Sequence, residues 1–560
     1  MRSNAIIECV PNFSEGRDLD LIAQIEHSIR KVTHIKLLNT DPGKSTNRTV
    51  ITFAGHPDLV IEAAFEAISM AAKLIDMRNH RGEHPRMGAT DVCPLIPISG
   101  ISLEETAEYA RRLGEKVGKE LSIPVYLYEA AATQPYRQNL ADIRSGEYEG
   151  LEEKMKSHEW FPDYGPQKFN AKSGATVIGA RDFLIAYNVN LNTQSVNLAN
   201  EIAYDIRENG RPLKDLVTHK ILKNEKGEIL RSLGSCPSVK AIGWYIDEYS
   251  YAQVSMNLTN MNVTPLHIAF EECRKSAEKN GLIVTGSELV GLVPKKTLMD
   301  AGIYFLKKQK RSCGVSESEL IRMAIQSMGL NACSEFIPSK RIIEYMLEEK
   351  NTTLVNLSLE KFAQETASDS PAPGGGSVSA YLGALGASLS TMVANLSIHK
   401  KGFEDKYDLF NKQAILGARL SAELLELVDK DTEAFTAIMN AFKLPKSSLE
   451  EKKARKKAIK NATINAIDVP MKTIEVALQI LPITKLMVEQ GNVNSISDAG
   501  VGALCIEAAI KGAALNVKIN ASTLDNEEDK KSYYSKANQY LKSATESVEE
   551  IMEYIHRKMI

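Results

Sequence analysis

Two histidines, two arginines and a glutamate are crowded into one nine-residue stretch, His80-Arg81-Gly82-Glu83-His84-Pro85-Arg86-Met87-Gly88. An imidazole titrates in the range where a general acid or base is useful, and flanking guanidinium groups suit an anionic substrate. His84 is the better catalytic candidate, because glycines and a proline hold its segment in an irregular conformation that lets the backbone approach a ligand. The plainer interpretation of a lone histidine is a hydrogen-bonded or surface imidazole, and the cationic neighbours weigh against it.

A zinc site is the weaker interpretation of this stretch. His80 and His84 are four residues apart, but the glycine and proline among them interrupt the helix that would align both rings on one ion. The seven cysteines are scattered along the chain without a CxxC pair, so we expect reduced, packed thiols. The sequence therefore predicts catalysis by side chains, with no metal.

The flanking elements indicate that this stretch connects a helix to a strand. Apolar residues recur at helical spacing from Val60 to Ile75, and an apolar run follows at Val92–Ile98. Up to about residue 330, β-rich runs alternate with amphipathic helices such as 18–31 and 103–121. The predicted strands are 6–10, 49–54, 92–98, 125–128, 175–178, 184–190 and 252–258.

From about residue 358 the sequence predicts long helices, including 449–481, 497–515 and 529–557, with almost no strand signal. The predicted fold class is therefore α+β, built from two α/β subdomains, followed by an all-α helical domain. The predicted boundaries are 1–181 and 182–347 for the two subdomains, 348–357 for a linker and 358–560 for the helical domain.

Composition and charge restrict the class of partner. A formal net charge of −3 excludes a chain-wide positive field, so we expect neither a nucleic acid nor a membrane partner. The N-terminal residues lack the apolar core of a signal peptide, which predicts a cytoplasmic protein. The small-residue stretch Val378–Leu396 is interpreted as a tightly packed helix of a soluble protein rather than a membrane span.

Longer motifs carry a resemblance to a known family. In the first half they are Glu8-Cys-Val-Pro-Asn-Phe-Ser-Glu-Gly16, Asp41-Pro-Gly-Lys-Ser-Thr-Asn-Arg-Thr49, Gly82–Ala89, Gly165–Gly174, Ala241–Tyr245 and Val290–Pro294. This half resembles glutamate formimidoyltransferase. The second half, with Ala372–Val378, Leu427–Asp431 and Leu444–Lys446, resembles formimidoyltetrahydrofolate cyclodeaminase. The order of the two is that of the bifunctional formimidoyltransferase-cyclodeaminase family of histidine breakdown.

The resemblance implies two consecutive reactions. The formimino group passes from N-formimino-L-glutamate to N5 of tetrahydrofolate, which releases glutamate, and the product is then closed to 5,10-methenyltetrahydrofolate with release of ammonia. It also implies two ferredoxin-like subdomains with folate in a groove between them, a helical dimer, and a homo-oligomer formed through both the transferase and the cyclodeaminase domains. The folate co-substrate is expected to be polyglutamylated.

Three residues of the first half take roles from the resemblance. His84 falls on the family's catalytic histidine, and Asp41 and Arg48 fall on its supporting aspartate and arginine. The transfer needs a base for the N5 proton, an anion near the amidinium, and cations for the glutamate carboxylates. Without the resemblance, Asp41 in Asp-Pro-Gly would be interpreted as a turn residue.

The family's folate-contacting segment falls on a glycine-bounded loop, where an aromatic ring suits the pterin or benzoyl group and two lysines suit glutamyl carboxylates. Its residues are Gly165, Pro166, Gln167, Lys168, Phe169, Asn170, Ala171, Lys172, Ser173 and Gly174. At two places this sequence departs from the family pattern, which affects the assignment of the family's residue roles to this chain. The Asn-His-Arg before Gly82 leaves the role of His80 open, and a longer segment at 209–239 leaves the far side of the groove open.

In the helical half the resemblance places the catalytic aspartate at Asp431. Helical geometry independently separates it from Asp429. Asp431 lies on the apolar stripe of Leu424, Leu427, Phe435 and Ile438, and Asp429 is rotated by roughly 200° towards Glu426 and Glu433. An inward carboxylate should have a raised pKa, which suits proton transfer from N10 to departing ammonia. A cap or a structural buried acid is the alternative.

Two further features of the helical half are candidates. The amide groups of Gly374–Gly376 are placed to receive an anionic group at a helix N-terminus. Asp498 matches a recurrent family position and is a candidate substrate-binding residue. A basic cluster, which is either a solvated helix face or a site for the polyglutamate tail, consists of Lys443, Lys446, Lys452, Lys453, Arg455, Lys456, Lys457 and Lys460.

Two alternatives for the helical half remain open. It could be a methenyltetrahydrofolate cyclohydrolase, a related activity of this domain type, or an oligomerisation scaffold with an idle site. The inward position of Asp431 argues against the scaffold.

Overall fold

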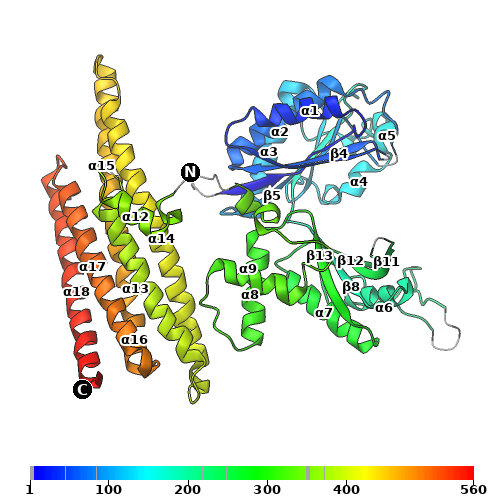
Figure 1. The fold of residues 1–560 in the computed structure, drawn as a ribbon. Coiled ribbons are helices and arrows are strands. Elements are labelled where there is room, and N and C mark those ends of the chain that lie inside the picture. Colours follow the sequence, from blue (N-terminus) through cyan, green and yellow to red (C-terminus); the bar gives the residue numbers. More distant parts are fainter. Residues whose placement is uncertain are drawn as a thin grey trace. The chain divides into compact units, whose positions relative to one another are not determined.

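The computed structural model describes residues 5–44, 46–82, 85–215, 218, 220–247, 249–347, 353–370 and 372–559. They form two compact units (Figure 1). The first unit consists of residues 1–301 and 324–348, and the second of 302–323 and 349–560. Strands are found in the first unit, and the long helices from residue 375 onward belong to the second, which confirms the predicted fold class.

The first sheet of unit 1 has seven strands. Its order is β1-β4-β2-β5-β7-β6, with β3 paired to the outer side of β4. The strands are β1 (Ile6–Cys9), β2 (Asn12–Phe13), β3 (Lys36–Gly43), β4 (Arg48–Gly55), β5 (Thr90–Ser99), β6 (Val125–Glu129) and β7 (Thr176–Ala180). Because β1 and β2 both lie between β4 and β5, they act as one interrupted strand, and β3-β4-(β1, β2)-β5 has the ferredoxin-like order. Strands β7 and β6 extend it in parallel.

Three helices cover one face of this sheet, and their apolar side chains form its main core. They are α1 (Leu19–Arg30), α2 (Pro57–Leu74) and α3 (Leu103–Leu121). The side chain of Asp18 caps α1, and a capping box of Ser102 and Glu105 begins α3. On the other face, α4 (Leu140–Arg144) and α5 (Glu147–Lys154) pack over β5, β6 and β7.

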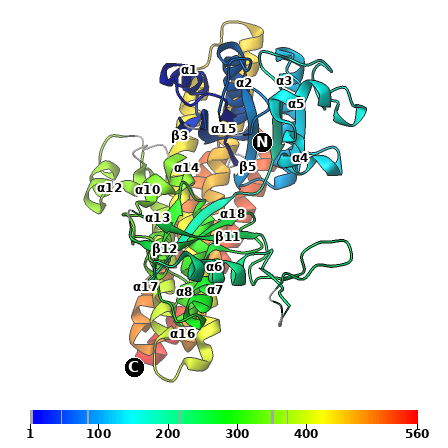
Figure 2. The same ribbon diagram turned by 90° about the vertical axis from the view of Figure 1, so that its right-hand side faces the viewer.

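The second sheet of unit 1 is antiparallel and ferredoxin-like, with the order β11-β12-β8-β13. Its strands are β8 (Ile185–Leu191), β11 (Val239–Ile246), β12 (Tyr251–Leu258) and β13 (Val284–Val290). Helices α6 (Val196–Ile206) and α7 (Leu266–Lys279) lie along one face (Figure 2). The long 209–239 segment contains a small hairpin of β9 (Arg211–Pro212) and β10 (Arg231–Ser232). The chain then forms α8 (Lys295–Lys308), α9 (Glu317–Met328), α10 (Pro338–Arg341) and α11 (Ile343–Leu347).

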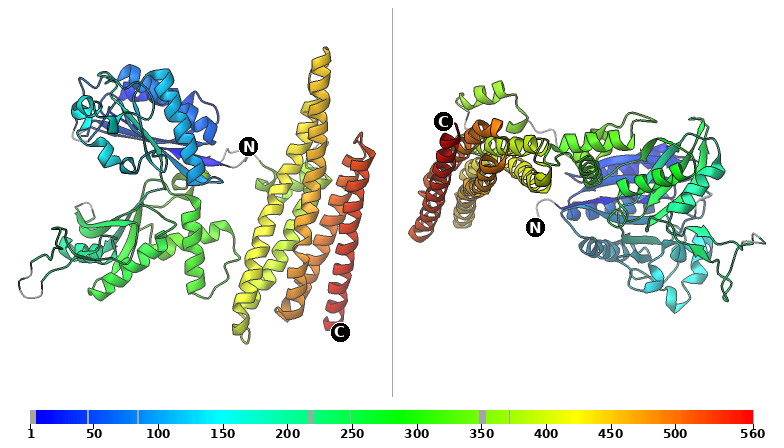
Figure 3. Two further views of the ribbon diagram at one scale, coloured as in Figure 1. Left: turned by 180° about the vertical axis from the view of Figure 1, so that it is seen from behind. Right: turned by 90° about the horizontal axis from the view of Figure 1, so that it is seen from below.

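Unit 2 is a bundle of long helices that run side by side in both views (Figures 1 and 3). Its helices are α12 (Leu359–Thr366), α13 (Gly375–Ile398), α14 (Tyr407–Lys443), α15 (Leu449–Leu478), α16 (Leu481–Gln490), α17 (Ile496–Ala521) and α18 (Glu527–Met559). Short 3-10 helices of this unit are η3 (Leu354–Asn356), η4 (Glu404–Lys406) and η5 (Val493–Ser495), and unit 1 contains η1 (Pro135–Arg137) and η2 (His158–Trp160).

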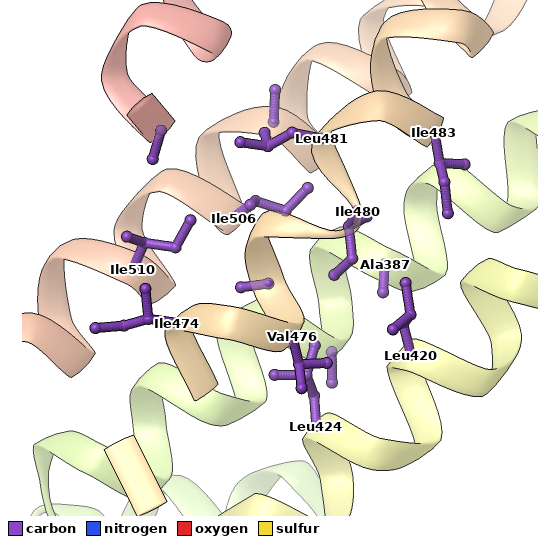
Figure 4. Close-up of a cluster of buried hydrophobic side chains, with 14 of the residues drawn as sticks. Ala387, Leu420, Leu424, Ile474, Val476, Ile480, Leu481, Ile483, Ile506 and Ile510 are labelled. Atoms are coloured by element: carbon purple, nitrogen blue, oxygen red, sulfur yellow. The ribbon is translucent and has the colours of Figure 1, made fainter. Parts of the chain in front are cut away.

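Helix α13 packs between α14 and α17 in the centre of this bundle. The core is aliphatic, and Figure 4 shows Leu420 and Leu424 beside Val476 and Ile480. Gly386 permits the close crossing of α13 and α17, because a Cβ atom there would lie 2.8 Å from the carbonyl oxygen of Gly502. This close packing explains the small-residue composition of α13.

Two helical stretches are long and apolar enough to cross a membrane by length and composition alone, Gly375–Ile398 and Val493–Ala521. In each, at least half of the most apolar window is buried against other helices of the bundle. Both therefore have the character of core helices, as predicted for the first from its small residues.

Candidate active sites in the two units

Asp41 and Arg48 lie on the β3-β4 hairpin and share one face of the sheet. Ladder pairing places Asp41 opposite Val50, and Val50 is two residues from Arg48 along β4. Ile51 points the other way, into the core under the helices. Burial lowers the pKa of Arg48, and the negative charges of Asp91 and Asp41 oppose this effect. The structure thus brings the two predicted residues together on the face opposite α1, α2 and α3.

Asp41 is a strand residue, so its interpretation as a turn residue is wrong. It lies in β3, which extends through Asp-Pro-Gly to Gly43. β3 is an edge strand of the sheet, where a proline that cannot donate to the ladder is tolerated.

His84 lies outside the described residues, as does Glu83. The described residues on its N-terminal side are tied to the β3-β4 hairpin. Asn47 donates a side-chain hydrogen bond to the carbonyl of Arg81 at 3.0 Å, and a Cβ on Gly82 would lie 2.3 Å from the carbonyl oxygen of Thr46. The chain that leads to His84 therefore passes beside the hairpin that carries Asp41 and Arg48, and the role of His84 stays a prediction.

His80, whose role the sequence left open, is buried, and both of its ring nitrogens lie within hydrogen-bond distance of protein groups, which favours a structural role. Its Nε2 lies 2.9 Å from the carbonyl oxygen of Asn47, and its Nδ1 accepts a hydrogen bond from Nε of Arg86 at 3.2 Å. A carbonyl only accepts, so the Nε2 proton is fixed and the ring is the neutral tautomer. Burial lowers the pKa of His80, which agrees with a neutral ring.

Arg86 is committed to protein partners. Its guanidinium donates to Glu147 at 2.9 Å and to both carboxylate oxygens of Glu149, at 2.8 and 2.6 Å. The hydrogen bonds that Arg86 donates to Glu149 raise the pKa of Arg86. The expectation that both arginines of this stretch suit an anionic substrate is therefore wrong for Arg86. Arg81, which is exposed, remains available for this role.

A buried carboxylate beside Arg48 was missed by the sequence analysis. Asp91, in the first residues of β5, is 1 % exposed and accepts hydrogen bonds from the backbone N–H of Met87 at 3.0 Å and from Nε of Arg144 at 3.3 Å. A second, shorter ion pair joins Asp91 to Nη2 of Arg144. Its charge also acts on Arg48. A charged residue inside an apolar strand was the only sequence signal for this pair.

The predicted folate segment, residues 165–174, packs against the loop that precedes β5. Gly174 has φ +66°, and a Cβ there would lie 2.1 Å from the carbonyl oxygen of Met87. Met77 donates its backbone N–H to the carbonyl of Lys172 at 2.9 Å. The glycine at this end is therefore required by a close backbone crossing, and the segment lies next to Met77 and Met87.

Side chains of the same segment differ in availability. The ammonium of Lys172 donates to the carbonyl of Lys73 at 2.8 Å, whereas Gln167 and Lys168 are exposed. Phe169 packs against Tyr148, with ring centroids 5.5 Å apart. Of the two lysines expected to bind glutamyl carboxylates, Lys168 is thus the more available.

In unit 2, Asp431 lies on α14 with its carboxylate against the N-terminus of α13. The Ser377 hydroxyl donates to Oδ2 of Asp431 at 3.0 Å, and a Cβ on Gly376 would lie 2.1 Å from Oδ1. Burial raises the pKa of Asp431, and hydrogen bonds from the side chain and backbone of Ser377 lower it. The predicted anion at the triple glycine is thus, in this structure, the side chain of Asp431 itself.

Asn516 is a further polar residue at this helix terminus. Its amide lies 3.4 Å from the position of a Cβ on Gly375, and its Nδ2 donates to the carbonyl of Gly512 at 2.9 Å. The structure does not bring Asp498 to this place. Asp498 precedes Asn516 by 18 positions on the same helix, α17, which is about 27 Å along a helix axis.

Asp429 points away from Asp431, as helical geometry predicted. Its predicted position beside Glu426 suggested a solvated side chain, but Asp429 is partly buried. Its Oδ1 accepts the backbone N–H of Leu354 at 2.7 Å, and burial raises its pKa. The sequence could not show this, because the contact comes from η3, a segment 75 residues earlier. Asp429 is a structural anchor for the chain that leads into the helical region.

Part of the basic cluster lines a cavity of about 560 Å³ between the start of α15 and the α17–α18 turn. The cationic lining residues are Lys446, Lys452, Arg455, Lys456 and Lys460. The opposite wall carries Asp525 and Asp529, and Lys456 lies 3.4 Å from Asp525. Five positive charges against two negative ones make the cavity suited to an anionic ligand.

Comparison with known protein families finds matches along nearly the whole chain. The model described as "Formiminotransferase domain, N-terminal subdomain" matches residues 6–181, and "Formiminotransferase domain" matches residues 186–348. The model "Formiminotransferase-cyclodeaminase" matches residues 358–539. The three matches follow the two ferredoxin-like sheets and the helical bundle in order.

Three relatives show the same division. The formimidoyltransferase-cyclodeaminase of Dictyostelium discoideum is 41 % identical over 99 % of both chains. The glutamate formimidoyltransferase of Thermoplasma acidophilum is 43 % identical over 54 % of this chain and 93 % of its own. The methenyltetrahydrofolate cyclohydrolase of Methylorubrum extorquens is 42 % identical over 30 % of this chain and 82 % of its own.

Proposed function

Because the chain belongs to the formiminotransferase-cyclodeaminase family, we propose that its two halves catalyse consecutive steps of one conversion. The chain is a bifunctional enzyme with a glutamate formimidoyltransferase half and a formimidoyltetrahydrofolate cyclodeaminase half. The first half moves the formimino group of N-formimino-L-glutamate to tetrahydrofolate. The second half forms 5,10-methenyltetrahydrofolate and ammonia. This conversion would serve the breakdown of histidine.

For the transfer, we assign the base to His84 and the supporting charges to Asp41 and Arg48. N5 of tetrahydrofolate attacks the formimino carbon and loses its proton to His84. The bond between that carbon and the glutamate nitrogen then breaks, and His84 returns the proton to the departing amine. Asp41 stabilises the positive amidinium, and Arg48 binds a carboxylate of the glutamate. The shared face of Asp41 and Arg48 supports this assignment. Residues 165–174 would contact the folate.

For the cyclisation, we assign the proton transfers to Asp431. N10 attacks the formimino carbon at N5, the new C–N bond closes the ring, and the bond to the departing nitrogen breaks. Asp431 takes the N10 proton and returns one to the leaving ammonia. The single observation that carries this assignment is its carboxylate, partly buried at the end of α13 with a pKa raised by burial.

The second candidate for the helical half is a methenyltetrahydrofolate cyclohydrolase. It is favoured by the similarity to the Methylorubrum extorquens protein of that name. A cyclodeaminase closes the ring and expels ammonia, whereas a cyclohydrolase opens the methenyl ring with water, so release of ammonia from purified 5-formimino-tetrahydrofolate distinguishes them. A helical half that serves only as an oligomerisation scaffold would give neither product.

The form of the folate substrate, the assembly of the protein and its compartment are further parts of the proposal. We infer that the folate carries a polyglutamate tail and that this tail binds in the cavity lined by the basic cluster, where its carboxylates would face five cationic side chains. The protein would assemble into a homo-oligomer and act in the cytoplasm. The free state of all seven cysteines supports a reducing compartment.

The direct test of the deaminase assignment is Asp431→Asn, which keeps the side-chain shape and removes the proton acceptor. Ammonia release from supplied 5-formimino-tetrahydrofolate should be lost, with formimino transfer unchanged. The matched control is Asp429→Asn, since Asp429 lies on the same helix but bonds to Leu354. Parental ammonia release from Asp431→Asn would make Asp431 a structural residue.

A further inference from the structure

The N-terminus of α13 has no cap from its own sequence. Its N-cap residue, Gly374, has no side chain to accept a hydrogen bond, and the first N–H groups of a helix have no acceptor within it. The carboxylate of Asp431 supplies an acceptor from another helix, because the backbone of Ser377 bonds to it. Asp431 is therefore held by the same helix end that it caps.

The side chain of Ser377 adds a second bond to this carboxylate. Its Oγ donates to Oδ2 of Asp431 at 3.0 Å, and Oγ1 of Thr432 lies 3.4 Å from the same Oγ. A serine hydroxyl has one proton, so while it donates to Asp431 it can only accept from Thr432. Ser377 is fully buried, so its hydroxyl bonds to protein groups rather than to bulk water.

We propose that Ser377 is the positioning residue of the deaminase site, which orients the Asp431 carboxylate and stabilises its ionised form. The proposal rests on the proposed function of Asp431. Both bonds from Ser377 go to the charged carboxylate, so each favours ionisation. The lack of a side chain at Gly376 lets the carboxylate approach the helix backbone this closely, since a Cβ atom there would lie 2.1 Å from Oδ1 of Asp431.

Three ion pairs lie on the helices that pack together in this unit. Lys430 pairs with Glu426 on α14, Lys472 of α15 pairs with Glu423, and Lys511 of α17 pairs with Glu507. In the described part of the chain, burial and the bonds from Ser377 are what act on the pKa of Asp431. Removal of the hydroxyl must therefore raise this pKa.

The experiment is a pH profile of kcat/KM for ammonia release from 5-formimino-tetrahydrofolate by the full chain. Ser377→Ala should move the acidic limb to higher pH by about one unit, which is a loss of about tenfold below the limb. Ser377→Thr keeps the hydroxyl and should restore the parental limb. The matched control is Ser379→Ala, since the hydroxyl of Ser379 bonds to the carbonyl of Gly375 in its own helix at 2.6 Å.

Circular dichroism and thermal unfolding of the same samples report whether the helical unit is folded, and formimino transfer, which belongs to the other unit, should not change. If Ser377→Ala fails to fold, Ser377→Cys replaces it, and its weaker donor should shift the limb in the same direction. An unmoved acidic limb in the folded variant, or an equal shift in Ser379→Ala, overturns the proposal. Full ammonia release by Asp431→Asn would instead overturn the proposed function, so the two failures are distinguishable.

Discussion

The carboxylate of Asp431 lies directly on the backbone of Gly376, where a Cβ atom would be 2.1 Å from Oδ1 and 2.5 Å from Cγ. Any side chain at this position must therefore displace the carboxylate. Gly376→Ala should lower ammonia release at least tenfold and leave formimino transfer unchanged. Gly374→Ala is the matched control, because the space beside Gly374 is open and its activity should be preserved. Equal activity of the two variants would show that the position of Asp431 does not matter.

His84→Ala should abolish formimino transfer and leave ammonia release from supplied 5-formimino-tetrahydrofolate intact, because the two assigned sites lie in separate units. Transfer is measured as glutamate released. The control is His27→Ala, since His27 is exposed on α1. Near-normal transfer by His84→Ala would remove the assignment of this histidine.

Binding of the polyglutamate tail by the basic cluster can be tested by comparing its lysines that line the cavity with those that do not. Lys452 and Lys456 line the cavity. Reversing their charge by substitution with glutamate should cause the enzyme to release free 5-formimino-tetrahydrofolate when the folate is a polyglutamate, with little change when it is a monoglutamate. The control is charge reversal of Lys453 and Lys457, which belong to the cluster but do not line the cavity, because it changes the net charge by the same amount. The effect should also weaken as salt is added. Equal effects of the pairs, or of the two substrates, would leave the cluster as a solvated surface.

Glu8 predicts a pH dependence of stability. It is 3 % exposed in β1, and burial raises its pKa to about 8, an effect that Arg181 opposes. A carboxyl whose pKa is raised by folding contributes stability that is complete below its unfolded pKa and is lost as pH rises through the folded value. Glu8→Gln, which stays neutral, should therefore raise Tm by several degrees at pH 8.5.

The same Glu8 variant should differ little from the parent at pH 5, where Glu8 is already protonated in the folded chain. Thermal unfolding at the two pH values measures the difference. A constant difference in Tm between pH 5 and pH 8.5 would show that the ionisation of Glu8 is not its cause.

Periodicity predicted most of the fold because it reports burial on one face of an element. The strands predicted at 6–10, 49–54, 92–98 and 125–128 appear as β1, β4, β5 and β6, and the helix predicted at 103–121 is α3. β3 was missed since its last residues, Asp-Pro-Gly, are a turn signature placed in an edge strand. Local signals cannot distinguish a turn from the end of an edge strand.

The sites were only partly predictable, because their chemistry depends on residues distant in sequence. Spacing around Arg86 suggested substrate binding, but Glu147 and Glu149 occupy its guanidinium. The Asp91–Arg144 pair joins β5 to α4 and had no local pattern. Helical geometry did separate Asp431 from Asp429, since rotation about one helix axis needs no knowledge of other elements. Their partners, Ser377 and Leu354, came only from the fold.

One coupled assay tests the central claim most directly. The full chain receives N-formimino-L-glutamate and tetrahydrofolate, and methenyltetrahydrofolate absorbance and ammonia are measured together. We predict that both products appear in equal amounts and that neither appears when either substrate is omitted. Glutamate release with accumulation of 5-formimino-tetrahydrofolate, without ammonia, would contradict the account of two consecutive activities in one chain.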